Sequence, residues 1–241
     1  MTAVVILPGL DGTSALLAEF CESLSALGVA ARAVAYPPDR PLGYEQLEAL
    51  VRAQLPCEPH VLLGESFSGP LAIRIAAAPP PGLLGLVLST TFARAPMVGL
   101  SPLAPLVRFA PSRPPMPILS WALLGPWATP QLRSQLVHAL ATVSPAVLRT
   151  RAAAALRVNV AALLPAITLP VLQLVATQDR LLSASASSDL AAHLSQCRTV
   201  AVPGPHLLLQ AATPPCAREV AEFALGLGPD NSKPAPLRGA A

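Results

Sequence analysis

Short apolar segments alternate with helical patterns along most of the chain, and this alternation most constrains the fold. The apolar segments lie at 3–7, 31–36, 60–64, 83–89, 170–176 and 198–202. Continuous apolar runs of this length are typical of strands that are buried on both faces, as in a parallel sheet. Helical patterns lie between them, at 14–27, 44–55, 68–78, 187–194 and 215–225. The order predicts a doubly wound α/β fold whose mostly parallel sheet has about six strands.

One connection between strands is too long for a simple crossover. From 93 to 165 the sequence has many prolines, helical patterns at 130–141 and 145–156, and no convincing strand. An excursion of this length between two core strands predicts an inserted helical cap. We therefore expect an α/β core formed by 1–92 and 166–227, a cap formed by 93–165, and a flexible tail at 228–241.

Composition narrows the class of protein. The chain has 241 residues, of which 53% are hydrophobic and 12% charged, so it can bury a sizeable core. A net charge of +3 without a basic patch argues against a nucleic-acid partner. The four cysteines are scattered without metal-ligand spacing, which predicts reduced thiols, no metal and no cofactor. The start lacks the features of a signal peptide and no window predicts a transmembrane segment, so we expect a cytoplasmic protein.

The junction after the strand at 60–64 contains the first candidate for chemistry. It reads Gly64-Glu65-Ser66-Phe67-Ser68-Gly69 and leads directly into a helical pattern. A nucleophile elbow needs small residues around its nucleophile because the strand and helix backbones approach closely there. Ser66 satisfies this requirement better than Ser68, which would place a proline at one of the small positions. From this junction alone, a phosphate-binding loop or an ordinary tight turn remain alternatives.

Two further residues complete a candidate catalytic triad. His206 follows the last predicted strand in a Gly/Pro loop, whereas the other three histidines lie in predicted strands or helices. No Asp or Glu occurs from 66 to 178, so Asp179 is the first carboxylate after Ser66, and it also follows a predicted strand. Ligands bind at the carboxyl ends of the strands in open α/β sheets. Ser66, Asp179 and His206 therefore predict a nucleophile, an acid and a base, in that order along the chain.

An oxyanion would need hydrogen-bond donors beside Ser66. The loop after the first strand reads Pro8-Gly9-Leu10-Asp11-Gly12-Thr13 and precedes a helical pattern. The backbone N–H of Leu10, together with that of Phe67, is expected to form the oxyanion hole. Glu65 is expected to be structural and paired, with tuning of His206 as the alternative. Ser68 is expected to be a tolerated small residue whose hydroxyl is satisfied locally.

The four motifs together resemble the α/β-hydrolase family over residues 1–225. They are LPGLDGT at 7–13, GESFSG at 64–69, TQDRL at 177–181 and GPHLLLQ at 204–210. The first loop of that family more often reads His-Gly, and here Pro8 replaces the histidine. The chain is most similar to small bacterial carboxylesterases, with the first two strands of the family's sheet missing. Its cap is placed like that of carboxylesterases acting on acyl-carrier-protein esters.

The resemblance implies a serine hydrolase that cleaves carboxylic esters with an apolar acyl or alcohol part. A small-molecule ester is then the expected partner, and Phe92, Trp121 and Trp127 are the expected substrate-binding residues. Packing of the cap on the core is the alternative explanation for its apolar residues, which include Leu100, Leu103, Leu106, Phe109 and Leu124. A thioesterase or acyltransferase, or a non-catalytic binding protein on a hydrolase scaffold, are the competing functions.

The predicted cap also carries positive charge alone. Its charged residues are Arg94, Arg108, Arg113, Arg133, Arg149, Arg151 and Arg157. Guanidinium groups without a nearby carboxylate repel one another unless something neutralises them. An anionic substrate, an acidic carrier protein or an anionic lipid surface would supply that compensation. The alternative is that these arginines pair with carboxylates of the core or face water.

Overall fold

A six-stranded sheet in the order β2-β1-β3-β4-β5-β6 forms the centre of the protein, and every pair of neighbouring strands is parallel. The structure is a computed structural model, and it describes residues 2–96 and 115–228. The strands are β1 (Ala3–Leu7), β2 (Ala31–Ala33), β3 (His60–Glu65), β4 (Leu83–Ser89), β5 (Val171–Ala176) and β6 (Cys197–Val202). The predicted doubly wound sheet is therefore confirmed.

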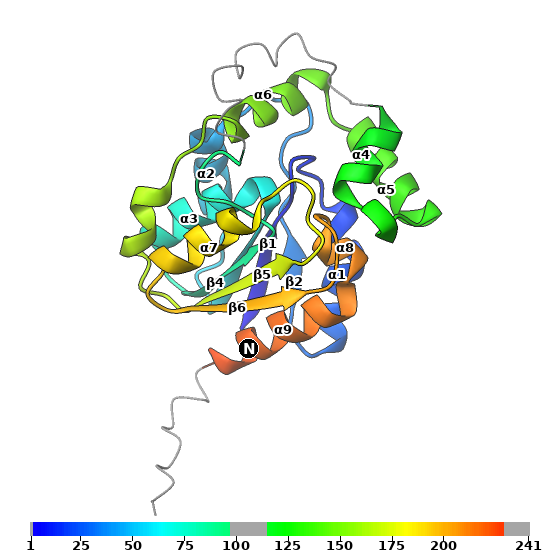
Figure 1. Cartoon of the computed structure of the whole chain (residues 1–241). Helices are drawn as coiled ribbons and strands as arrows, with labels where there is room; N and C mark the ends of the chain where they lie inside the picture. The colour runs from blue at the N-terminus through cyan, green and yellow to red at the C-terminus, as the bar shows by residue number, and fades with distance from the viewer. Residues whose placement is uncertain (1, 97–114, 229–241) are drawn as a thin grey trace, which may run out of the picture.

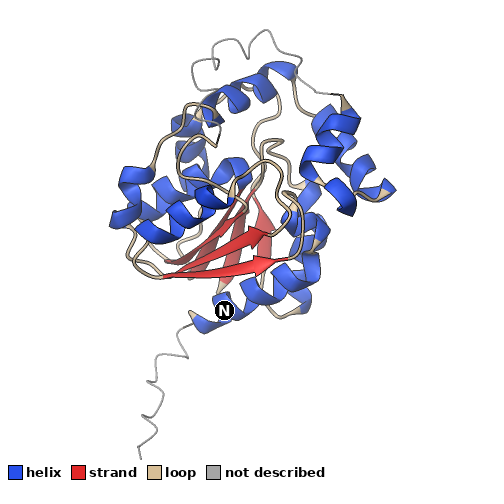
Figure 2. Cartoon of the chain, viewed as in Figure 1, coloured by secondary structure: helices blue, strands red, loops and turns tan. Residues whose placement is uncertain are grey.

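Helices cover both faces of the sheet (Figures 1 and 2). On one face lie α1 (Ala18–Ala26) and α9 (Thr213–Gly226), and on the other lie α2 (Tyr44–Arg52), α3 (Gly69–Ala77) and α7 (Ala184–His193). Strand β1 shows how the sequence divides the core, because successive side chains of a strand point to opposite faces. Val4 and Ile6 pack with α1 and α9, whereas Val5 and Leu7 pack with α2 and α3.

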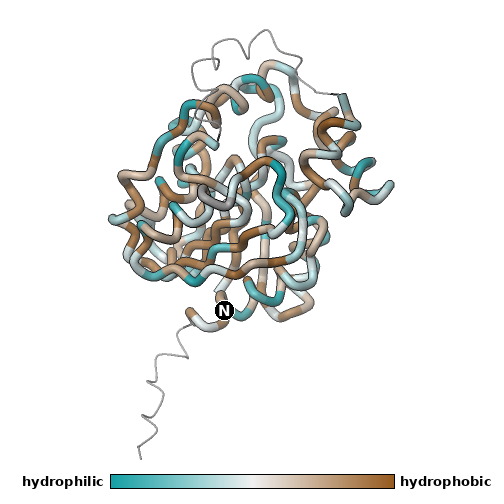
Figure 3. The backbone as a smooth tube through the Cα atoms, viewed as in Figure 1, coloured by the Kyte–Doolittle hydropathy of each residue, from teal (hydrophilic) through white to brown (hydrophobic). Residues whose placement is uncertain are grey.

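The long connection between β4 and β5 is helical where the structure describes it. It contains α4 (Met116–Leu123), η4 (Gly125–Trp127), α5 (Pro130–Ala141), α6 (Pro145–Ala155) and η5 (Ala161–Ala166). A separate hydrophobic cluster joins α4–α6 to the core through Leu16 and Leu207. Figure 3 shows hydrophobic residues along the central strands and also along α4. Residues 97–114 of the predicted cap and 229–241 of the predicted tail lie outside the described residues.

Several boundaries differ from those expected. Strand β2 ends at Ala33 rather than at 36, and the helix expected at 14–27 is divided into η1 (Ala15–Leu17) and α1. A short helix that the sequence did not suggest, α8 (Leu208–Ala211), follows His206. In the part of the chain that is described, none of the helices is both long enough and apolar enough to span a bilayer. All four cysteines are free thiols.

The crossing of β3 and α3 leaves no space for a side chain at Gly64. A Cβ added there would lie 2.7 Å from the Cβ of Ala72 and 2.9 Å from the carbonyl oxygen of Ser68. We expect Gly64→Ala to lower the free energy of unfolding by roughly 1–3 kcal/mol, because the two elements must move apart. Denaturant unfolding followed by circular dichroism measures this loss. Gly226→Ala is the matched control, since nothing lies within 4 Å of its Cβ; equal effects of both substitutions would contradict the prediction.

Candidate active site

Ser66 lies at a strained turn between β3 and α3. It begins the short helix η2 (Ser66–Ser68), and its φ of 45° is in the left-handed region that side chains rarely adopt. The hydroxyl of Thr91, which follows β4, donates to the carbonyl oxygen of Ser66 at 2.5 Å. A Cβ at Gly69 would lie 1.8 Å from the Oγ1 of Thr91, so only glycine lets Thr91 reach this carbonyl. The turn is thus held from a neighbouring strand.

The structure brings the predicted nucleophile, base and acid together. Ser66 Oγ lies 2.7 Å from His206 Nε2, and His206 Nδ1 lies 2.8 Å from Asp179 Oδ2. With the proton assigned to Nδ1, His206 donates to the carboxylate and accepts from the serine hydroxyl. The side chains of His206 and Asp179 are 4% and 8% exposed. The side chains of the base and the acid are therefore largely shielded from water.

Asp179 is held as a carboxylate. Burial opposes its ionisation, but hydrogen bonding to His206 and the attraction of the imidazole outweigh burial and keep the pKa of Asp179 below its ordinary value. The backbone N–H groups of Leu181 and Leu182 also donate to Oδ1, at 2.8 and 2.9 Å. An ionised Asp179 orients His206 and stabilises an imidazolium when one forms.

A pocket of about 250 Å³ opens beside Ser66 Oγ. Leu10 and Phe67, the expected oxyanion donors, both line it, and so does Phe92, an expected substrate-binding residue. Of the described residues that line it, all except Ser66 and His206 are apolar. The others are Pro96, Ala152, Ala155, Leu156, Leu181 and Leu182, of which Ala152 and Ala155 belong to α6 and Leu156 follows it. The pocket can hold an apolar group next to the serine.

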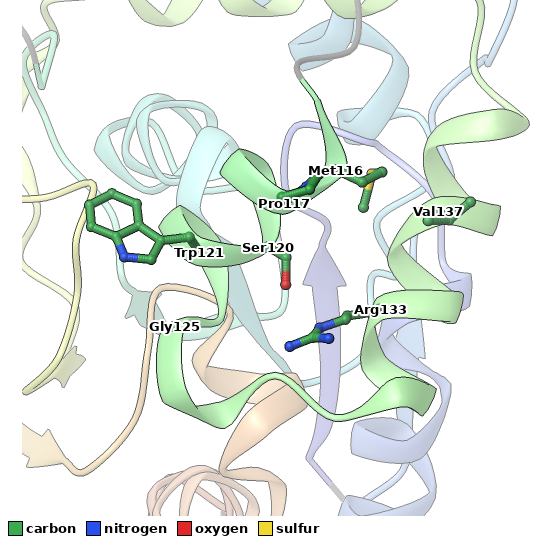
Figure 4. A pocket seen from close by; sticks show the side chains of 7 residues that line it. All are labelled: Met116, Pro117, Ser120, Trp121, Gly125, Arg133 and Val137. Atoms are coloured by element: carbon green, nitrogen blue, oxygen red, sulfur yellow. The ribbon is translucent and has the colours of Figure 1, made fainter.

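Trp121 and Trp127 are not among the residues that line this pocket, and their expected role in substrate binding stays a prediction. Trp121 is 61% exposed and lines a different pocket, between α4 and α5, where its ring points away from Ser120 and Arg133 (Figure 4). Its indole stacks under the guanidinium of Arg180, 4.7 Å from the ring centroid. Trp127 donates its indole N–H to Gln178 at 2.9 Å. Both rings are occupied in anchoring the cap to the loop around Asp179.

The remaining apolar residues named for the cap have other positions. Leu124 is fully buried in the cluster that joins α4–α6 to the core, as the packing alternative expected. Leu100, Leu103, Leu106 and Phe109 lie outside the described residues.

The described arginines of the predicted cap differ in their surroundings, and the expected anionic partner stays a prediction. Arg151 is 1% exposed and therefore cannot meet a partner. Arg94 lies 3.7 Å from the carboxylate of Asp189 on α7, as the pairing alternative expected. Arg133 and Arg157 are exposed, while Arg108 and Arg113 lie outside the described residues. Packing of α6 against the first loop accounts for the burial of Arg151.

Polar contacts that the sequence did not suggest fix the residues on both sides of Ser66. The hydroxyl of Tyr44 donates to the carbonyl of Phe67 at 2.9 Å, and the two rings stack with centroids 4.8 Å apart. Ser68 Oγ donates to the carbonyl of Pro8 and lies 2.7 Å from the hydroxyl of Tyr36. The expectation that the Ser68 hydroxyl is satisfied locally is therefore wrong. The only signal of these contacts in the sequence was Ser68 itself, which stands where the nucleophile-elbow motif has its second glycine.

Glu65 connects the three segments of the site. It is 2% exposed, and its Oε1 accepts a hydrogen bond from the Nε2 of Gln210 on α8 at 3.0 Å. Its carboxyl group also accepts a hydrogen bond from the backbone of Gly9, in the first loop. Burial, opposed by the Gln210 hydrogen bond and reinforced by the charge of Asp11, raises the pKa of Glu65 to about 7. Glu65 is paired and structural, as expected, and it is largely neutral below that pH.

No group of three or more metal-ligating side chains occurs among residues 2–96 and 115–228.

No known family profile matches the chain, and no curated protein matches it in sequence. Solved structures do match. An enol-lactonase from Burkholderia xenovorans superimposes with a TM-score of 0.75 at 18% identity, covering 93% of this chain and 91% of the lactonase.

Two further matches have other activities. An esterase from Thermogutta terrifontis gives a TM-score of 0.76 at 19% identity, covering 94% of this chain and 90% of the esterase. A proline iminopeptidase from Mycobacterium smegmatis gives a TM-score of 0.69 at 19% identity, with the same two coverages of 94% and 90%. The chain has the α/β-hydrolase fold, as its motifs predicted.

The raised pKa of Glu65 predicts a specific pH dependence of stability. Between its ordinary value of 4.5 and about 7, native Glu65 keeps a proton that the unfolded chain has lost. The free energy of unfolding should therefore fall as the pH rises through this window, and Glu65→Gln should remove that fall. At about 1.4 kcal/mol per pH unit, the difference between the two proteins reaches at most about 3.5 kcal/mol.

Urea unfolding at pH 4.5, 6 and 8 measures the effect as a difference between the two proteins. The amide suits the site, because rotating Gln210 presents its Oε1, which has no partner now, to the new N–H group. Parallel curves of unfolding free energy against pH for the two proteins would show that Glu65 is ionised throughout.

Proposed function

We propose that the protein is a serine hydrolase that cleaves carboxylic esters through an acyl-enzyme on Ser66. The continuous hydrogen-bonded chain from Ser66 through His206 to Asp179, at the edge of an apolar pocket, carries this proposal. A serine hydroxyl is a weak nucleophile unless a base is oriented to take its proton. A binding protein on the same scaffold has no need of this arrangement.

The reaction follows from the positions of the groups. Ser66 Oγ attacks the ester carbonyl carbon while its proton passes to His206 Nε2, and the carbonyl π electrons move to oxygen. The N–H groups of Leu10 and Phe67 donate to that oxyanion. When the tetrahedral intermediate collapses, the C–O bond to the alcohol breaks and the imidazolium protonates the leaving oxygen. Water then repeats the sequence on the acyl-enzyme, releasing the carboxylic acid and restoring Ser66.

The pocket supports an ester with a small apolar group. Its volume of about 250 Å³ is slightly below the range of roughly 300–1,000 Å³ typical of drug-sized ligands. Among the described residues, its lining offers no ionisable group besides His206 to neutralise an anionic acyl chain. The similarity of the fold to an esterase and a lactonase agrees with ester chemistry, while the iminopeptidase has the same fold and cleaves another bond.

Removing the nucleophile should abolish hydrolysis of a p-nitrophenyl ester. Loss of a triad serine or histidine typically lowers kcat by about a millionfold, so we expect this of Ser66→Ala and His206→Ala, and a smaller loss of Asp179→Asn. Ser14→Ala is the control, because Ser14 is exposed and caps no helix through its side chain. A fluorophosphonate probe should label the wild-type protein and leave Ser66→Ala unlabelled. If Ser66→Ala retained a tenth of the wild-type activity, Ser66 would not be the nucleophile.

The pocket wall on α6 should set the acyl chain length. Ala152 lines the pocket and Ala153 does not. We expect Ala152→Leu to lower kcat/KM for hexanoyl esters roughly tenfold relative to acetyl esters, because the added carbons occupy the space of the chain. Ala153→Leu makes the same chemical change outside the pocket and should leave the ratio of the two kcat/KM values unchanged. The same ratio in all three proteins would place the acyl group elsewhere.

A further inference from the structure

Arg151 is the largest fully buried side chain among the described residues, and it comes from α6. Its guanidinium makes three hydrogen bonds to backbone carbonyls. Nη1 donates to Leu10 at 3.1 Å and to Asp11 at 2.6 Å, and Nη2 donates to Pro37 at 3.1 Å. Two of these three carbonyls belong to the loop that supplies one of the proposed oxyanion donors. Arg151 therefore joins the helix that lines the pocket to that loop.

A buried cation requires compensation, and the surroundings of Arg151 provide it. The guanidinium carbon lies 5.4 Å from the ring centroid of Tyr36, a cation–π arrangement. Burial lowers the pKa of Arg151, while the charge of the buried Asp11 carboxylate opposes this change. Asp11 itself is held by the N–H and hydroxyl of Thr13, at 2.9 and 2.6 Å. The first loop is thus built around the cation.

The contact constrains, through Gly12, the peptide group between Gly9 and Leu10, which carries the Leu10 N–H. Gly12 donates its N–H to the carbonyl of Gly9 at 3.0 Å, so the loop closes on itself. Arg151 holds the carbonyl of Asp11, and the peptide of that carbonyl carries the Gly12 N–H that holds the Gly9–Leu10 peptide. A Cβ at Gly12, whose φ is +69°, would lie 2.2 Å from Nη1 of Arg151, so the guanidinium reaches the carbonyls of Leu10 and Asp11 only because residue 12 is glycine. Without the guanidinium, the carbonyl of Asp11 loses its donor and the Asp11–Gly12 peptide is no longer held. The Gly12 N–H, which fixes the Gly9–Leu10 peptide and with it the Leu10 N–H, then loses its support.

We propose that Arg151 is a positioning residue that holds the first loop so that the Leu10 N–H points at the developing oxyanion. The inference rests on the proposed function, since it requires a tetrahedral intermediate on Ser66. The same helix lines the pocket through Ala152 and Ala155. Helix α6 therefore forms part of the pocket wall and, through Arg151, is attached to the loop that carries the Leu10 N–H.

Arg151→Ala tests the proposal through the separation of kcat from KM. Loss of one oxyanion donor lowers kcat by about 10²–10³, because the donor acts on charge that develops only in the transition state. We expect a loss in kcat of this size, a KM within about threefold of the wild type, and an equal loss of affinity for a boronic acid transition-state analogue. Added methylguanidinium should restore part of kcat by occupying the vacated space.

Arg157→Ala is the matched control. Arg157 follows α6 but is exposed, and its Nε donates to the carbonyl of Ala153, outside the active site. Its loss should leave kcat, KM and analogue affinity unchanged, with no response to methylguanidinium. Arg151→Lys keeps the charge but places its donors on a single nitrogen, and its kcat should lie between those of wild type and Arg151→Ala.

The outcomes separate this inference from the proposed function. If wild-type protein neither cleaves esters nor reacts with the fluorophosphonate, the proposed function fails. If it does both, and a folded Arg151→Ala or Arg151→Lys keeps wild-type kcat and analogue affinity, only the positioning role is overturned. A raised KM with unchanged kcat would overturn it as well, because Arg151 would then act in substrate binding. Failure of both variants to fold would show that Arg151 serves the fold rather than the loop.

Discussion

The close approach of β3 and α3 is the constraint on which the rest of the site depends. At Gly64 the two backbones leave no room for a Cβ, and the chain turns between them with Ser66 in the left-handed region. Such a conformation costs about 1–3 kcal/mol and persists only when its surroundings hold it. Thr91 on one side and the stacked pair of Tyr44 and Phe67 on the other provide that support. The serine is consequently presented by packing rather than by a flexible loop.

A buried polar layer beneath the serine converts this local turn into a site built from several segments. Glu65 bonds to Gln210 and to the loop at Gly9, Ser68 bonds to Pro8, and Arg151 bonds to Leu10 and Asp11. In a medium of low dielectric, each such bond is strong when made and expensive when missing. The layer therefore limits how far the nucleophile, the first loop and the histidine can move relative to one another.

The parts of this arrangement that could be predicted from sequence are those with a local pattern. Buried strands appear as continuous apolar runs, and Ser66, Asp179 and His206 each follow such a run, so their meeting at one edge of the sheet follows from the parallel topology. Arg151 has no such pattern, because the carbonyls that accept its hydrogen bonds lie more than 110 residues away along the chain. The absence of Asp and Glu from the predicted cap suggested an external partner for its arginines. Backbone carbonyl oxygens can also compensate a guanidinium, as they do for Arg151. The contacts of Trp121 and Trp127 were missed for a related reason, because hydrophobicity does not identify the polar partners of a ring, which here are Arg180 and Gln178.

The separation of 140 residues between Ser66 and His206 also has a consequence for synthesis. The nucleophile, its strained turn and the first loop all lie in the first third of the chain, and their strands β1 and β3 are neighbours in the sheet. The imidazole follows β6, at the far edge of the sheet, and emerges from the ribosome late. At about 5–20 residues per second, several seconds of translation separate the two. A chain interrupted before His206 therefore carries Ser66 without the imidazole that would take its proton, and its serine hydroxyl remains a weak nucleophile.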